Sequence, residues 1–152
     1  MTTNNRSLVA GILLGGLTAG TIDIGAASLI SWLSPIFILH VVAAGLLGRS
    51  ASFAGGLPTA ALGMVLQWAM SLIIAAIYAA GGLLLPILRR LWLVGGLSYG
   101  VAIFFVMNYV VVPLSALQRF PRFMVLSFVE NMLAMLLFGV IVAYFLRGPR
   151  ES

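Results

Sequence analysis

The chain has 152 residues, of which 62% are apolar and only 7% are charged. Soluble domains contain about 25% charged residues, so this composition, with a mean hydropathy of +1.19, excludes that class and predicts an integral membrane protein. The absence of cysteine from the sequence excludes disulfides, thiolate nucleophiles and cysteine-based metal sites.

Four apolar runs are long enough to cross a bilayer, which takes about 20 residues. The first run is too long for the apolar part of a signal peptide, so we expect it to remain in the protein as a span. The sequence predicts an all-α, polytopic membrane helical bundle that forms a single domain over residues 1–152. The predicted spans are 8–33, 57–80, 91–112 and 123–146.

Two shorter segments connect these spans. Residues 36–47 form an apolar run of only about a dozen residues, too short to span, which predicts an interfacial or re-entrant helix. Residues 81–90, GGLLLPILRR, predict an interfacial turn.

All six prolines lie at or beyond the ends of the predicted spans. Because proline breaks a helix interior, this placement predicts straight, unbroken spanning helices. Transporters with discontinuous helices show Gly/Pro interruptions in corresponding halves, so the pattern disfavours that class. The prolines are Pro35, Pro58, Pro86, Pro113, Pro121 and Pro149.

The arginines, which are the only basic residues apart from one histidine, predict the orientation. Cytoplasmic loops of membrane proteins carry an excess of basic residues, and the side that holds both termini has five arginines against three. We therefore expect both termini in the cytoplasm. Arginines that flank apolar runs mark the membrane boundary, so the net charge of +5 predicts no nucleic-acid partner. The five are Arg6, Arg89, Arg90, Arg147 and Arg150; the three are Arg49, Arg119 and Arg122.

Each span carries small residues at every fourth position, on one helix face that also bears polar residues. Small faces let membrane helices approach closely, so we expect the polar residues to face the bundle interior. The faces are Gly11, Gly15, Ala19, Asp23, Ala27 and Ser31 in the first span; Thr59, Gly63, Gln67, Ser71, Ala75 and Ala79 in the second; Gly96, Gly100, Phe104 and Asn108 in the third; and Ser127, Asn131, Met135, Gly139 and Ala143 in the fourth.

Five of the polar residues fall at a similar depth, about 8–15 Å from the outer ends of their helices. They are Asp23, Gln67, Asn108, Glu130 and Asn131. A shared depth on four helices predicts one polar intramembrane site in the outer half of the bundle. The simpler alternative for Gln67, Asn108 and Asn131 is that they form hydrogen bonds between helices.

The two acids of this set are the candidate titrating groups. An ionised carboxylate in hydrocarbon costs about 2.5–3.5 kcal/mol, so taking up a proton is the less costly state for Asp23 and Glu130. The single histidine, His40, lies on the short segment; it is either an interfacial residue or a ligand or proton relay beside the acids. We expect no metal and no cofactor.

From Ala19 to about Arg147 the chain resembles a widespread group of small, uncharacterised bacterial inner-membrane proteins, which implies that this protein lies in such a membrane. The resemblance rests on AGTIDIGAA at 19–27, VVAAGLLGRSASFAGG at 41–56, TAALG at 59–63 and YVVVPLSA at 109–116. It implies a four-helix membrane protein in which the acid at Asp23 recurs. It also implies histidine at the positions of Gln67 and Asn131, and this departure disfavours a histidine-based metal or haem site here.

Two functions remain open from the sequence. One is a proton or small-solute pathway, with Asp23 and Glu130 as titrating groups. The other is a non-catalytic subunit or assembly factor of a larger membrane complex, whose partners are the lipid bilayer and other subunits or further copies of the chain. We do not expect an enzyme, because no nucleophile–base pair or metal cage is present.

Overall fold

The structure is a computed structural model, which describes residues 2–122 and 124–147, with side chains from residue 5 onward. Residue 123, where the fourth predicted span begins, lies outside the described residues, as do Pro149 and Arg150. The described residues form helices and connecting turns, without strands. The helices are α1 (Thr2–Ser31), α2 (Pro35–Leu47), α3 (Arg49–Ala54), α4 (Gly56–Leu84), α5 (Pro86–Arg90), α6 (Trp92–Val106), the π-helix η1 (Met107–Val111), α7 (Val112–Leu114) and α8 (Val125–Leu146).

Four helices are long and apolar enough to cross a membrane, which confirms the predicted fold class. They are Asn5–Ser31, Gly56–Leu84, Trp92–Leu114 and Val125–Leu146, and the shorter apolar helix is Pro35–Leu47. The predicted turn over 81–90 is shorter than expected. Its first four residues continue α4, and only Leu85 and α5 form the connection to α6.

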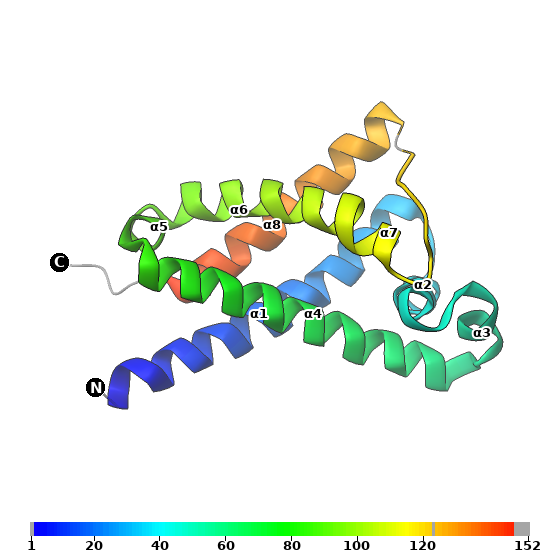
Figure 1. Cartoon of the computed structure of the whole chain (residues 1–152), viewed down its shortest axis with the longest axis horizontal. Coiled ribbons are helices and arrows are strands. Elements are labelled where there is room, and N and C mark those ends of the chain that lie inside the picture. The colour runs from blue at the N-terminus through cyan, green and yellow to red at the C-terminus, as the bar shows by residue number, and fades with distance from the viewer. Residues whose placement is uncertain (1, 123, 148–152) are drawn as a thin grey trace.

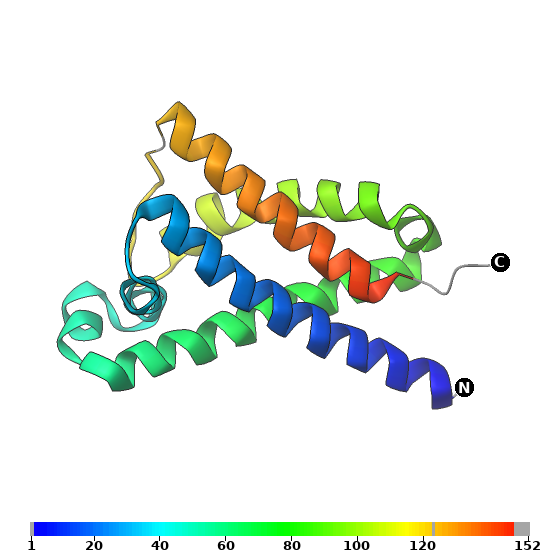
Figure 2. The ribbon, with the colours of Figure 1, turned by 180° about the vertical axis from the view of Figure 1, so that it is seen from behind.

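The long helices run back and forth between two ends of the bundle (Figures 1 and 2). α1 begins and α8 ends at one end, while α2 and α3 lie at the other. Both views show α2 end-on, so its axis lies crosswise to the long helices. Ser34 starts this crosswise helix, because its hydroxyl accepts a hydrogen bond from the Phe37 amide (3.2 Å) and Pro35 occupies the first turn.

The third span is not the unbroken α-helix that the sequence predicts. Pro113 lies inside its last turn and has no amide hydrogen to donate. The preceding residues widen into the π-helix η1, in which the Val112 amide donates to the carbonyl of Met107. The prolines therefore do not all lie outside the spans, and one of them accompanies a local change of helix type.

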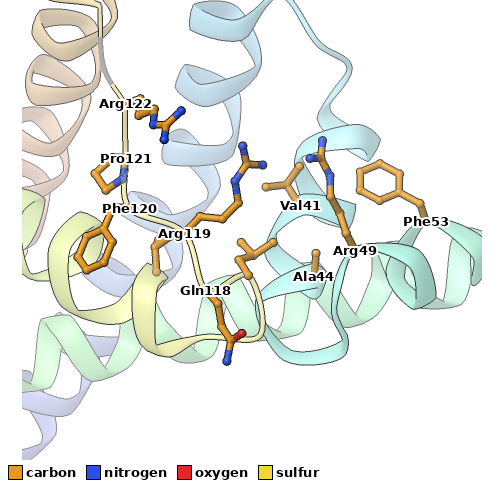
Figure 3. A pocket seen from close by; sticks show the side chains of 11 residues that line it. Val41, Ala44, Arg49, Phe53, Gln118, Arg119, Phe120, Pro121 and Arg122 are labelled. Atoms are coloured by element: carbon orange, nitrogen blue, oxygen red, sulfur yellow. The ribbon is translucent and has the colours of Figure 1, made fainter.

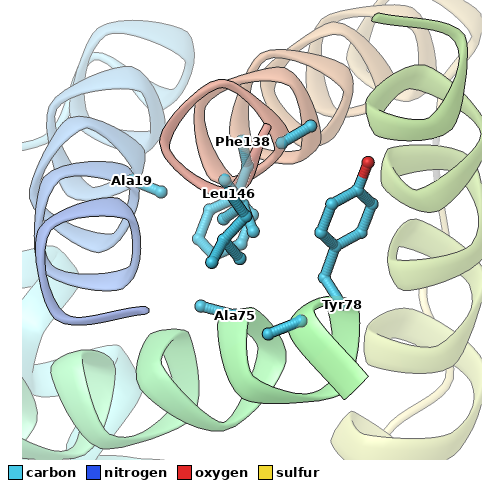
Figure 4. Close-up of a cluster of buried hydrophobic side chains, with 8 residues drawn as sticks. Ala19, Ala75, Tyr78, Phe138 and Leu146 are labelled. Carbon is cyan, nitrogen blue, oxygen red and sulfur yellow. The ribbon is translucent and has the colours of Figure 1, made fainter. Parts of the chain in front are cut away.

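The bundle core combines small side chains of α1 and α4 with larger ones of α4 and α8 (Figure 4). Lipid supplies no hydrophobic drive between helices, so membrane helices gain stability from close van der Waals packing. The small-residue faces serve this purpose. The buried cluster consists of Ala19, Ala75, Tyr78, Ala79, Phe138, Val142, Ala143 and Leu146.

Glycines allow α6 and α8 to approach each other closely. A methyl group added at Gly139 would collide with the Gly96 carbonyl oxygen and lie 2.8 Å from the Gly100 nitrogen. The predicted small faces of the third and fourth spans therefore do pack on each other.

Candidate functional site

The only direct bond among the predicted site residues joins α1 to α4. The Gln67 Nε2 amide donates a hydrogen bond of 2.9 Å to Oδ2 of Asp23. Both side chains are half-buried. The close approach of the two helices makes this bond possible, because Gly16 and Gly20 of α1 lie directly against Leu72 and Ser71 of α4.

A second hydrogen bond joins the same two helices. The indole Nε1 of Trp68 donates to the Thr21 hydroxyl at 3.1 Å. The sequence analysis did not single out Thr21. The feature of the sequence that could have pointed to Thr21 is its position two residues before Asp23 on the same helix.

The two asparagines form hydrogen bonds within their own helices. Asn108 Nδ2 donates to the Phe104 carbonyl at 2.9 Å, and Asn131 Nδ2 donates to the Ser127 carbonyl at 2.7 Å. Glu130 is half-buried on α8 and makes no hydrogen bond or ion pair within residues 2–122 and 124–147. The bonded polar site is thus the Asp23–Gln67 pair, and the other three residues of similar depth are not connected to it.

His40 holds together the corner between α2, α3 and α4. Its Nδ1 lies 3.0 Å from the Ser52 carbonyl oxygen and 3.2 Å from the Thr59 hydroxyl, and the Ser52 hydroxyl donates to the His40 carbonyl at 2.6 Å. A carbonyl oxygen only accepts, so the first contact assigns the proton to Nδ1. The ring also stacks on Phe53, with centroids 5.2 Å apart. None of these bonds reaches Asp23.

Metal-ligating side chains do not gather in the part of the chain that the structure describes. No three His, Asp or Glu side chains come together there.

A feature outside the predicted set is an open pocket of about 640 Å³ at the end of the bundle that carries α2 and α3. Figure 3 shows Arg49 on one side of this pocket and Arg119 and Arg122 on the other, above an apolar wall. The sequence analysis used these three arginines only as boundary markers. The sequence analysis placed all three on the same side of the membrane, and this was the feature that could have suggested a shared site.

Protein-family models, curated proteins and solved structures yield no significant match to this chain. The resemblance based on AGTIDIGAA and YVVVPLSA therefore stays a prediction.

Proposed function

We propose that the chain is a small, non-catalytic multi-pass protein of a bacterial inner membrane that passes a proton or a small polar solute through an intramembrane site between α1 and α4. The observation that carries this proposal is the hydrogen bond from Gln67 to Asp23 within two spanning helices. Ionisable residues inside membrane spans are costly and commonly mark ion or proton paths.

The two oxygens of the Asp23 carboxyl group have different surroundings. Oδ2 accepts from Gln67, which fixes the orientation of the group. Oδ1 accepts no hydrogen bond from the described residues. It is also not among the buried polar atoms that lack a hydrogen-bond partner, so part of its surface is accessible. A proton or the donor of a small solute therefore has an oxygen to bind, while Gln67 keeps the carboxyl group in place.

The orientation of the protein is part of the same proposal. The end of the bundle where α1 begins and α8 ends carries Arg6, Arg89, Arg90 and Arg147. The end with α2 and α3 carries the three pocket arginines. By the positive-inside rule the first end faces the cytoplasm, and α2, crosswise to the spans, lies at the opposite membrane surface.

The substitution Asp23→Asn tests this role directly. Asparagine has nearly the same shape and can still accept from Gln67, but it cannot take up a proton at neutral pH. In liposomes that contain the purified protein, we expect proton or solute flux to fall to that of protein-free liposomes.

A matched control removes the other α1–α4 hydrogen bond without touching the acid. Thr21→Val deletes the acceptor of Trp68 and should keep the flux of the wild type. Unchanged flux in Asp23→Asn would contradict the proposed pathway, whereas equal loss in both variants would indicate that only helix contact matters.

A second candidate function, a non-catalytic subunit or assembly factor of a larger complex, is favoured by Glu130. This half-buried carboxyl group lies in an apolar span without a partner among the described residues. Leu126 and Leu133, one turn before and one turn after Glu130 on the same face of α8, are 70% and 58% exposed. A helix from another subunit at this place would supply a hydrogen-bond donor to the acid.

Native mass spectrometry of the protein, extracted gently from its own membranes, tests this second function. If the chain is a subunit, it should appear in an assembly heavier than its own 16.1 kDa, and Glu130→Leu should reduce that assembly. A lone 16.1 kDa species from wild-type membranes would count against it.

A further inference from the structure

The arginine pocket, which is the open pocket beside α2 and α3, has a charged side and an apolar side. Arg49, Arg119 and Arg122 supply its charge, while Val41 and Leu117 contribute to an apolar surface. In Figure 3, Arg49 and Arg119 extend in the same direction from either side of Val41. A volume of about 640 Å³ is within the range of small-molecule sites in proteins.

Among the residues that the structure describes, these arginines have no counter-charge. The whole sequence contains three carboxylate side chains, Asp23, Glu130 and Glu151; the first is bonded to Gln67, and Glu151 lies outside the described residues. Within the described part of the chain, no pocket arginine forms an ion pair or a hydrogen bond. Three guanidinium groups therefore line one pocket, and their N–H donors are available to bind a ligand.

The backbone keeps the two sides of the pocket in place. Arg49 begins α3 directly after Gly48, whose positive φ of 80° turns the chain. The loop that carries Arg119 is tied back to α2, because the Ala116 amide donates to the Gly45 carbonyl at 2.8 Å. The two arginines thus come from segments that a backbone hydrogen bond holds side by side.

We propose that this pocket binds a phosphate group at the membrane surface. The guanidinium group presents a planar fork of N–H donors that matches phosphate oxygens, and a phosphate can engage several such forks at once. The pocket lies at the ends of the spanning helices, where lipid headgroups lie, and its apolar wall suits the carbon chain to which such a group is attached. None of its lining residues belongs to the Asp23–Gln67 pair, so the two sites can be tested apart.

The test compares two variants that remove the same charge from opposite ends of the bundle. Arg49→Gln with Arg119→Gln removes two guanidinium groups from the pocket, and Arg6→Gln with Arg90→Gln removes two from the other end. All four side chains are exposed, so both variants should melt at the wild-type temperature in the absence of a probe. Each full-length protein in detergent is titrated with phosphatidic acid by native mass spectrometry, and with inorganic phosphate by thermal melting.

We expect the pocket variant to bind the phosphate probe at least about tenfold more weakly than the wild type, since hydrogen bonds to charged groups are lost. The variant at the other end should bind as the wild type does. A pocket-dependent response to phosphatidic acid alone identifies a lipid headgroup as the ligand, and one to inorganic phosphate identifies a soluble phosphate. Equal binding by the two variants, whether strong or weak, would overturn the proposal.

Discussion

Replacing Gly139 with alanine should separate α6 from α8 and strongly destabilise the bundle. The added methyl group would collide with the Gly96 carbonyl oxygen and lie 2.8–2.9 Å from the Gly100 backbone. Backbone atoms cannot rotate away as a side chain can, so the helices themselves must move apart. We expect a loss of about 3 kcal/mol in the free energy of unfolding, at the upper end for overpacked sites, measured by denaturant-induced unfolding in detergent micelles.

Gly25→Ala is the matched control for this change. Gly25 also lies in a spanning helix, and no atom lies within 4 Å of the position that its added methyl group would occupy. It should unfold as the wild type does. A Gly139→Ala protein as stable as Gly25→Ala would mean that α6 and α8 are not packed as described.

The second large effect is expected from Gly63→Ala, which acts where α2 crosses α4. A methyl group at Gly63 would collide with the Leu39 carbonyl oxygen and lie 2.7 Å from the Leu39 carbonyl carbon. Because Leu39 precedes His40, displacing α2 also loosens the two hydrogen bonds between His40 and Ser52. We expect a loss of about 2 kcal/mol in the free energy of unfolding, with faster hydrogen exchange at the amides of α2.

Gly81→Ala, in the same helix α4, separates this contact from a general effect of alanine. Its added methyl group would come only to 3.7 Å from a Leu88 side-chain carbon, an ordinary van der Waals distance. Hydrogen exchange in α2 should be unchanged in this variant. If Gly63→Ala left the exchange in α2 equally unchanged, the close α2–α4 crossing would be wrong.

Much of the architecture could be predicted from the sequence because it follows from local requirements. A helix that crosses hydrocarbon needs a long apolar run, and such a run can be recognised without knowledge of its neighbours. The short helix α2 followed from the same argument, since its apolar run is too short to span. The small faces of the spans could also be recognised as surfaces for close packing, because small residues at every fourth position share one helix face. Which face packs on which was not predictable in this way.

The rule that a proline marks the end of a spanning helix did not hold at Pro113. Its position near the end of the third apolar run predicted an edge, yet the helix continues two residues beyond the predicted end, to Leu114, and changes to π-helix before the proline. Whether a proline ends a helix or is accommodated depends on what the next residues can bond to. That information is not contained in the hydropathy pattern.

The contacts of the polar residues could not be predicted from the sequence. The similar depth of the polar residues on four helices was inferred from the 1.5 Å rise per residue, but depth leaves open the rotation of each helix and its distance from the others. Only the packing of α1 on α4 brings Gln67 to Asp23, while Asn108 and Asn131 bond within their own helices. The arginine pocket depends in the same way on tertiary structure, because Arg49 and Arg119 are 70 positions apart in the sequence. The sequence by itself therefore determined the spans and their polar residues, since these follow from the local cost of burying charge and backbone in lipid. Which of these residues meet was decided by the rotation and crossing of the helices, because side-chain packing over the whole bundle sets both.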